Sequence, residues 1–419
     1  MKKRTVLTSI FAFVVIVAIA IGFFALKQKE KRENEIEQKN RSVYTLVDEE
    51  YNKIAQTLDF KLYESGIDGV FYSLSPVKYF SVKGGSVTEL TPAGKMKVSP
   101  VVGTCKMKFE IDFIKTENDV FGVGVWHSDS GVYNDAFAVL KRASGQLSSR
   151  EYLLLIDTNA GEKSASERTF SEIFAVSKSG SECSYIFDRS NITVEESGKL
   201  RTDWDVVKLG CLNASFKGGV PVLTGRKYNR DRTNQKYDLR TFKNGSKTPV
   251  ATAVSDAFIG VSADTLTYIR QNKADWELLS SDGKKEKKIA SFEGIIGSDY
   301  TVFGTLAVNK TDKSLISLSD GKSYDALKDF KAVYSVGENS KRIILVGKEE
   351  NRDGEDYKVQ KIVLLDKAGG KTLTLYANDI MDENTSLSTC SEGIITLKNG
   401  KSVFISYSDI ETIGAGVVK

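Results

Sequence analysis

The sequence predicts an all-β fold made of repeated units of short strands, and two observations lead to this prediction. Runs of four to seven residues rich in Val, Ile, Phe, Tyr and Thr alternate with tight-turn pairs, as in Val77–Val82 followed by Gly84-Gly85. The turns also recur, most regularly at Gly245, Gly283 and Gly321, which lie 38 residues apart. A recurrence near 40 residues leaves room for four short strands, which is the size of one β-propeller blade.

Several further runs show the same pattern of an apolar strand that ends in a turn. The Asn-Gly, Asp-Gly and Gly-Gly pairs at these turns supply the positive φ that two-residue hairpins require. From about residue 62 onward the chain would hold about seven blades, or eight. Two tandem β-sandwiches are the alternative, but they need a linker, and with only 5 Pro no stretch has the composition of a hinge. The runs are Tyr152–Ile156, Trp276–Leu279, Leu315–Leu318, Ile362–Leu365 and Ile394–Leu397.

The charge of the chain is concentrated at its N-terminus. The whole chain of 419 residues carries a net charge of +4, whereas residues 1–41 alone carry +5 and the remainder −1. A nucleic-acid-binding domain carries a basic patch or stripe on its folded body. The nearly neutral body therefore gives no sign of nucleic-acid binding.

An uncharged stretch follows the first basic residues. Lys2, Lys3 and Arg4 precede Thr5–Leu26, which has 22 residues without a charge. A helix of that length rises about 33 Å, enough to cross a hydrocarbon core of about 30 Å. We expect residues 1–4 to be a cytoplasmic tail, 5–26 a transmembrane signal-anchor helix, and the bulk of a single-pass cell-membrane protein to lie outside the cytoplasm. A cleaved signal peptide ending at Ala18-Ile19-Ala20 is the alternative.

Residues 27–60 are predicted to connect this segment to the folded body. Lys27–Arg41 has almost no apolar residue, which suits an exposed charged stalk. The spacing of Val43, Val47, Tyr51, Ile54 and Leu58 then predicts an amphipathic helix over residues 42–58. Its apolar face would dock onto the following domain or associate with a second copy. Residues 61–419 are predicted to form the propeller ectodomain.

One predicted hairpin carries a family resemblance. The segment Trp276–Lys285, with echoes at Ser317–Lys322 and Leu364–Lys371, ends an apolar run in an Asp, a Gly and a Lys. It resembles the outer hairpins of bacterial extracytoplasmic β-propeller proteins of the quinoprotein-like and Tol-type superfamily. The regular Trp docking motif of true quinoproteins is missing, so the resemblance implies no cofactor. It implies a scaffold that binds protein or glycan.

Motifs for catalysis are missing from the sequence. The single His, His127, excludes most zinc, haem and Ser-His-Asp chemistry. The sequence contains no G-x-S-x-G nucleophile elbow, no G-x-x-x-x-G-K-[ST] phosphate loop and no C-x-x-C pair. We therefore expect no catalytic residue, no metal ion and no cofactor.

Two segments are candidates for binding a partner. Trp126, His127 and Asp129 stand where an apolar strand runs into a turn. A basic loop further along the chain could bind an anionic polymer or a partner. Its candidate residues are Arg226, Tyr228, Arg230 and Arg232.

The four cysteines permit disulfides outside the cytoplasm. Cys183 and Cys211 lie 28 residues apart, whereas Cys105 and Cys390 lie near the two ends of the ring, which closure would bring together. The candidate pairs are therefore Cys183–Cys211 and Cys105–Cys390. Four buried thiols are the alternative.

These observations favour a membrane-anchored extracytoplasmic β-propeller that acts as a non-catalytic binding or assembly scaffold at the cell surface. A membrane-tethered hydrolase that acts on glycans through carboxylates at the propeller mouth is one alternative. A subunit of a cell-envelope assembly is another. The expected partners are the membrane, through Thr5–Leu26, and a protein or glycan on the propeller face.

Overall fold

The computed structural model describes most of the chain after residue 51. The described ranges are 27, 41–45, 52–129, 135–142, 151–159, 161, 164, 168, 170, 172–188, 194–196, 199–201, 204–206, 220–226, 237–242, 250–255, 257–261, 264–324, 332–348, 359–368, 372–378 and 387–417.

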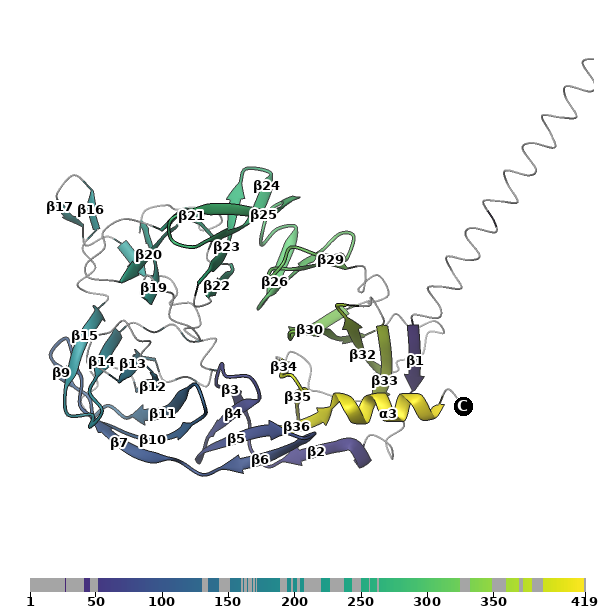
Figure 1. The fold of residues 1–419 in the computed structure, drawn as a ribbon, viewed down its shortest axis with the longest axis horizontal. Helices are drawn as coiled ribbons and strands as arrows, with labels where there is room; N and C mark the ends of the chain where they lie inside the picture. Colours follow the sequence, from purple (N-terminus) through teal and green to yellow (C-terminus); the bar gives the residue numbers. More distant parts are fainter. Residues whose placement is uncertain are drawn as a thin grey trace, which may run out of the picture.

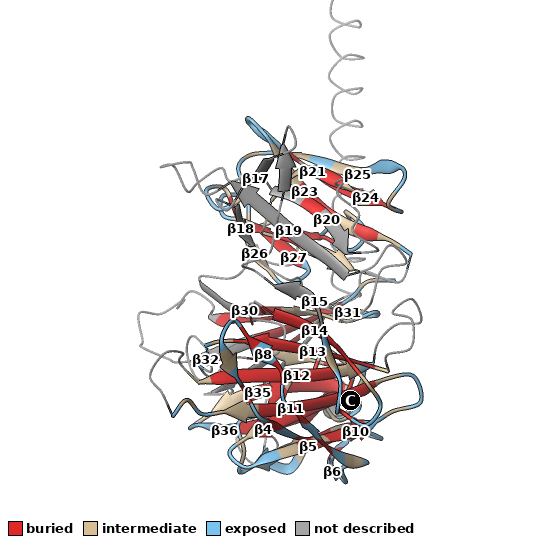
Figure 2. Cartoon of the chain, turned by 90° about the vertical axis from the view of Figure 1, so that its left-hand side faces the viewer, coloured by how far each residue is buried: buried red, intermediate tan, exposed pale blue. Residues whose placement is uncertain are grey.

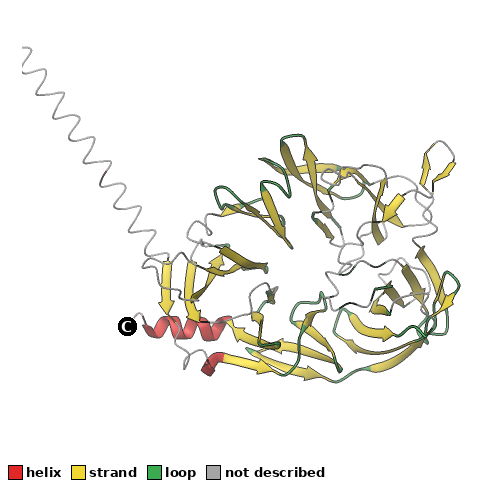
Figure 3. Cartoon of the chain, turned by 180° about the vertical axis from the view of Figure 1, so that it is seen from behind, coloured by secondary structure: helices red, strands yellow, loops and turns green. Residues whose placement is uncertain are grey.

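The described chain is built almost wholly from antiparallel strands, and its sheets follow one another around a ring (Figure 1). We number the seven sheets of four or more described strands 1 to 7 in chain order. Figure 3 shows how little helix accompanies them. The prediction of an all-β fold is confirmed.

The first two sheets differ in size. Sheet 1 is a four-stranded meander, and sheet 2 has seven strands with a two-stranded hairpin, β8–β9, beside it. Sheet 1 comprises β3 (Tyr63–Glu64), β4 (Val70–Leu74), β5 (Val77–Lys83) and β6 (Ser86–Leu90). Sheet 2 comprises β7 (Gly94–Val98), β10 (Phe109–Lys115), β11 (Val120–Trp126), β12 (Ala136–Arg142), β13 (Tyr152–Asp157), β14 (Glu172–Val176) and β15 (Cys183–Asp188). The hairpin comprises β8 (Val101–Val102) and β9 (Cys105–Lys106).

The next three sheets are four-stranded antiparallel meanders, preceded by a small hairpin of β16 (Val194–Glu196) and β17 (Lys199–Arg201). Sheet 3 comprises β18 (Trp204–Val206), β19 (Val220–Arg226), β20 (Tyr237–Phe242) and β21 (Ala251–Val254). Sheet 4 comprises β22 (Ile259–Val261), β23 (Leu266–Asn272), β24 (Asp275–Ser281) and β25 (Glu286–Glu293). Sheet 5 comprises β26 (Tyr300–Phe303), β27 (Leu306–Asn309), β28 (Leu315–Ser317) and β29 (Ser323–Tyr324).

Strands from the N-terminal part of the chain complete the last two sheets. In sheet 6, β1 lies parallel to β33, and in sheet 7, β2 lies antiparallel to β36. Sheet 6 comprises β30 (Ala332–Glu338), β31 (Arg342–Lys348), β32 (Val359–Asp366), β33 (Thr372–Asn378) and β1 (Arg41–Thr45). Sheet 7 comprises β34 (Ser388–Thr389), β35 (Gly393–Lys398), β36 (Lys401–Ser406) and β2 (Ala55–Leu58). Helix α3 (Tyr407–Val417) follows β36 directly.

The helix predicted over residues 42–58 is wrong at both of its ends, because residues 41–45 and 55–58 are strands. A helix of this length is marginal on its own, because its first turn is costly to nucleate. The open edges of β33 and β36 instead offer ready backbone hydrogen-bond partners. Pairing with the ring therefore outweighs the helical spacing of the apolar residues.

The predicted membrane segment Thr5–Leu26 lies outside the described residues. Within the described part of the chain, no helix has the length and apolar character needed to cross a membrane.

Six apolar clusters hold neighbouring sheets together, and each cluster draws its buried residues from two consecutive sheets of the ring. They join sheets 1 and 2, 3 and 4, 4 and 5, 5 and 6, 6 and 7, and finally 7 and 1. At the seam of sheets 4 and 5, for example, the fully buried ring of Trp276 stacks on Phe292 and meets the ring of Tyr300 edge-on. The core is therefore distributed around the ring.

Sheet 2 buries both of its faces. One face packs on sheet 1, and the other holds its own cluster, which includes Met96, Phe109, Ile111 and residues of the β8–β9 hairpin. Glycines in β11 leave room for the neighbouring strand β10 on this side of the sheet. A Cβ on Gly124 would lie 2.8 Å from Ile111 Cγ1. Figure 2 shows the middle strands of this sheet as buried bands.

Candidate functional site

The loop after β11 contains the first predicted binding segment. Trp126 is half-buried at the end of β11, where it packs against the inner cluster of sheet 2. His127 and Asp129 are exposed, the side chain of His127 by 78%. The structure thus places the three predicted residues together, with an apolar base and a polar, solvent-facing rim.

Asp135 fixes the position of His127. Its Oδ2 lies 2.9 Å from His127 Nδ1, and its Oδ1 accepts a hydrogen bond of 3.1 Å from the backbone N–H of Ser128. These two hydrogen bonds hold the pKa of the Asp135 carboxyl below its usual range, with the contact to His127 as the larger cause. When Nδ1 carries a proton toward Asp135, the exposed Nε2 is left to accept a hydrogen bond from a partner.

The His127–Asp135 pair is open to solvent, since the two side chains are 78% and 45% exposed. An imidazole beside a carboxylate can act as a base, but proton abstraction at neutral pH is efficient in sites that exclude water, whereas this pair is exposed. In the part of the chain that the structure describes, no group of three His, Cys, Asp or Glu side chains could hold a metal ion.

The second predicted segment is only partly described. Arg226 ends β19, where its backbone pairs with Trp204 of β18. Tyr228, Arg230 and Arg232 lie outside the described residues. Their role in binding stays a prediction.

The cysteines do not form the longer of the two predicted disulfides. Cys105 lies in the β8–β9 hairpin beside sheet 2, and Cys390 is buried at the seam of sheets 7 and 1; both are free thiols. The Cys105–Cys390 pair is therefore wrong: although the ring closes, its two ends meet through other residues. Cys211 lies outside the described residues, so the Cys183–Cys211 pair stays a prediction.

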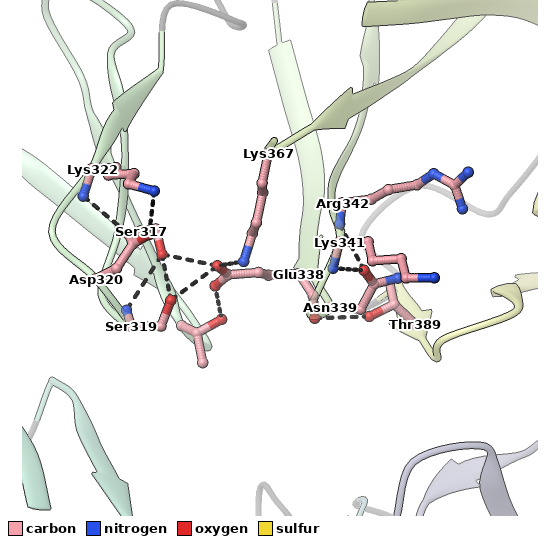
Figure 4. A network of polar contacts seen from close by, with 11 residues as sticks. Ser317, Ser319, Asp320, Lys322, Glu338, Asn339, Lys341, Arg342, Lys367 and Thr389 are labelled. Carbon is pink, nitrogen blue, oxygen red and sulfur yellow. Dashed lines mark hydrogen bonds and ion pairs between the residues drawn. The ribbon is translucent and has the colours of Figure 1, made fainter. Parts of the chain in front are cut away.

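The most densely bonded polar cluster in Figure 4 surrounds Glu338, at the end of β30. The side chain of Glu338 is only 4% exposed, and its carboxylate is in ion-pair contact with Lys367 Nζ. Hydroxyl groups of sheet 5 supply the other donors: Thr305 at 2.5 Å, Ser317 at 2.8 Å and Ser319 at 3.3 Å. We call this set the Glu338 clasp.

The next residue extends the contacts to sheet 7. Asn339 Oδ1 accepts hydrogen bonds from the backbone N–H groups of Lys341 and Arg342, which shapes the β30–β31 turn. Asn339 Nδ2 donates to the carbonyl of Cys390 at 2.9 Å and to the hydroxyl of Tyr407 at 3.2 Å. Two consecutive residues thus tie sheet 6 to both of its neighbours.

The Glu338 clasp leaves the carboxylate little capacity for chemistry. Four donors, one of them an ammonium, occupy a group that has about four lone-pair directions. A carboxylate that acts as a nucleophile or general base needs an available oxygen, so this one is a structural anchor. Sequence reasoning missed it because its partners lie 19 to 33 residues away along the chain.

A second buried charge has a similar role. Arg168, with no exposed side-chain surface, forms an ion pair with Asp157 at 3.3 Å and stacks 3.6 Å from the ring centroid of Phe137. It also donates to the backbone carbonyls of Asn159 and Gly161. Arg168 therefore holds the chain that follows β13 against sheet 2.

A third polar contact joins sheets 3 and 4 and gives a pH-dependent prediction. Arg270 donates to both carboxylate oxygens of Glu286, at 2.8 and 2.6 Å, and to the carbonyl of Thr252 in sheet 3. These bonds to Arg270, with a further one from Tyr268, lower the pKa of Glu286, although desolvation opposes the shift.

We expect Glu286→Gln to destabilise the chain at pH 7 and to cost much less near pH 3.5. A carboxyl whose pKa is lowered by folding contributes stability above its unfolded pKa, near 4.5, and loses it as the pH falls through the folded-state value. Urea unfolding of both proteins at the two pH values measures the difference. An equal difference at both values would show that the charge of Glu286 contributes nothing.

The comparisons with known proteins are distant. No protein-family model and no curated protein matches the chain. The solved structures similar to it include the tricorn protease, at 11% identity over 81% of this chain with a TM-score of 0.29. The chain spans 41% of that protein's length.

Two other solved structures are similar to the same degree. The uncharacterized protein lmo1340 from Listeria monocytogenes EGD-e is 9% identical over 87% of this chain and 92% of its own, with a TM-score of 0.26. The phage phi92 endosialidase is 9% identical over 84% of this chain and 68% of its own, with a TM-score of 0.25. The tricorn protease and the endosialidase have β-propeller-type folds. TM-scores this low say nothing about activity.

Proposed function

We propose that the chain is a seven-bladed, membrane-anchored β-propeller that binds a protein partner outside the cytoplasm and performs no catalysis. In this proposal each of the seven sheets is one blade, and Thr5–Leu26 is the anchor. The quinoprotein-like and Tol-type propellers remain the superfamily it resembles.

One observation carries the proposal. Two buried carboxylates, Asp157 and Glu338, are each paired with a cation and bonded within the fold, while a third, Glu172, is buried in β14 of sheet 2. A hydrolase of glycans needs two carboxyl groups that face a substrate across about 5–10 Å. The Glu338 contacts join sheets 5 and 6, and loops held by such a packed scaffold are common places for recognition sites.

Among such loops, the one after β11 is the proposed contact. It offers the half-buried ring of Trp126, the exposed Nε2 of His127 and the exposed carboxylate of Asp129. The set is rich in acceptors, so it fits a partner that brings hydrogen-bond donors.

Photo-crosslinking in intact membranes tests this proposal. The full chain carrying a benzophenone amino acid at position 129 is expected to give one discrete protein adduct, which weakens at least threefold when His127→Ala is added. The same probe at Lys83, an exposed residue of sheet 1, is the matched control and should give no discrete adduct.

Two results would contradict the proposal. The first is the same adduct pattern from positions 129 and 83. The second is turnover of a glycan by the purified full chain, which would favour the membrane-tethered hydrolase. An adduct with several envelope proteins at once would favour the alternative of an assembly subunit.

A further inference from the structure

The loops after β11 and after β13 leave sheet 2 side by side. The backbone register pairs Trp126, at the end of β11, with Ala136 of β12. Phe137, the next residue of β12, pairs with Asp157 at the end of β13. Neighbouring strands lie about 4.8 Å apart, so the two loops begin within about 10 Å of each other. The loop after β13 is therefore a near neighbour of the proposed contact around His127.

A buried arginine fixes the course of the loop after β13. One terminal nitrogen of the Arg168 guanidinium group donates to the carboxylate of Asp157 at 3.3 Å and to the carbonyl of Asn159 at 3.2 Å. The other terminal nitrogen donates to the carbonyl of Gly161 at 2.6 Å. The guanidinium carbon lies 3.6 Å from the ring centroid of Phe137 in the neighbouring strand. A planar group that is always charged thus holds three acceptors of this loop in a fixed arrangement.

These hydrogen bonds use the backbone of Asn159, whereas the residue itself is exposed. Its N–H donates to the carboxylate of Asp157 at 3.0 Å, and its carbonyl accepts from Arg168. The side-chain amide of an asparagine carries one acceptor oxygen and two donor hydrogens. Binding through this amide needs no further ordering of the backbone at this position, which lowers the entropic cost of binding.

We propose that Asn159 belongs to the recognition surface around His127, and that the buried Arg168 acts as its positioning residue. The inference rests on the proposed function, because it extends the same surface. Arg168 has no exposed side-chain surface, so it acts on the partner only through the loop that it holds.

The chemistry of Asn159 also indicates which part of the protein partner it binds. The Nε2 of His127 and the carboxylate of Asp129 take hydrogen-bond donors, whereas the amide of Asn159 takes a donor and an acceptor together. The N–H and C=O of one residue point to the same side of an extended strand and present this combination. Gln56 makes this pairing within the chain, since its amide donates to the carbonyl of Val87 at 3.0 Å and accepts from the N–H of Val87 at 2.9 Å. We therefore assign an extended backbone segment of the partner to Asn159.

Photo-crosslinking from position 159 tests this assignment. The full chain in intact membranes, carrying the benzophenone amino acid at position 159, is expected to give the same protein adduct as the probe at position 129. Asn118 is the matched control, because it is an exposed asparagine in the loop between β10 and β11, at the opposite end of β11. A probe there should give no discrete adduct.

A second measurement uses variants of exposed residues with the probe kept at position 129. Asn159→Ala is expected to weaken the adduct about fivefold, because it removes both hydrogen bonds to the partner's backbone. Asn118→Ala should leave the adduct unchanged.

Arg168→Lys tests the positioning role. A lysine keeps the positive charge beside Asp157, but its compact ammonium group cannot reproduce the fork that reaches the carbonyls of Asn159 and Gly161. The adduct from position 159 is expected to weaken about fivefold, whereas the adduct from position 129 should change by less than about twofold. A residue that only stabilised the fold would weaken both adducts together. Where Arg168→Lys fails to fold, Arg168→Met combined with Asp157→Asn removes both charges, leaves no buried charge unpaired and should give the same difference.

Three results would overturn the inference. The first is a discrete adduct from position 129 with none from position 159. The second is an adduct from position 129 that keeps its wild-type strength in Asn159→Ala. The third is equal weakening of both adducts in the folded Arg168 variants, which would remove the positioning role. If neither position gave an adduct, the proposed function itself would be contradicted, and this inference with it.

Discussion

Gly393→Ala is expected to lower the free energy of unfolding by about 3 kcal/mol, because the added methyl group has no room. A Cβ on Gly393 would lie 2.4 Å from the carbonyl oxygen of Ile405 and 2.5 Å from Phe404 Cε2. Phe404 is held in the seam with sheet 1 and Ile405 in the seam with sheet 6. Neither neighbour can move without disturbing a packed cluster.

Urea unfolding measures this effect, and Gly161→Ala is the control. A Cβ there would meet only Asn159 Oδ1 at 3.8 Å, and the backbone does not adopt a positive φ. We expect a change within about 0.5 kcal/mol for this exposed position. Equal losses for the two variants would contradict the close packing described for Gly393.

Glu338→Ala is expected to cost about 4 kcal/mol, because it leaves the ammonium of Lys367 largely buried without its counter-charge. The Lys367 side chain is 16% exposed, so water can restore little of the lost interaction. The hydroxyl groups of Thr305 and Ser317 lose their acceptor as well. Chemical denaturation of the full chain measures this loss in the free energy of unfolding.

A double-mutant cycle separates the ion pair from the fold around it. Glu338→Gln combined with Lys367→Met removes both charges. The double variant should be more stable than the sum of the stability losses of the two single variants predicts. A loss below about 1 kcal/mol for Glu338→Ala, or simple additivity in the cycle, would mean that the clasp contributes nothing beyond a surface ion pair.

The strands and their turns could be predicted from the sequence because both are local. Gly84-Gly85 and Asn399-Gly400 do connect paired strands, and all four residues have positive φ. The spacing of Gly283 and Gly321 does reflect consecutive sheets of four strands. Turn chemistry and alternating burial act within a few residues, so a sequence displays them directly.

Sheet 2 and the N-terminal strands could not be predicted in the same way. Gly122 and Gly124 let β11 approach β10 closely, but nothing in the sequence distinguishes such glycines from turn glycines. The strands β1 and β2 depend on edges formed more than 300 residues later. The start of helix α3, in contrast, is marked locally in the sequence by Ser406, a residue type that favours the position before a helix. In the structure its hydroxyl accepts a capping hydrogen bond from the N–H of Asp409, three residues on.

In the candidate binding site, too, residues that are close in sequence could be predicted, whereas contacts between residues further apart in sequence could not. Trp126, His127 and Asp129 are neighbours in sequence, so their common loop was predictable. Asp135, which orients His127, follows eight residues later in the sequence. The Glu338 clasp assembles residues from four separate segments, and no spacing rule encodes such an assembly.

The pairing of β2 with β36 also sets the order of events during synthesis. At about 5–20 residues per second, the ribosome needs about 20 to 70 s to reach β36 after it has made β2. Throughout that interval β2 is a finished strand whose partner does not exist. The nascent chain must keep this edge from pairing elsewhere, and its ring becomes complete only when the last strand emerges.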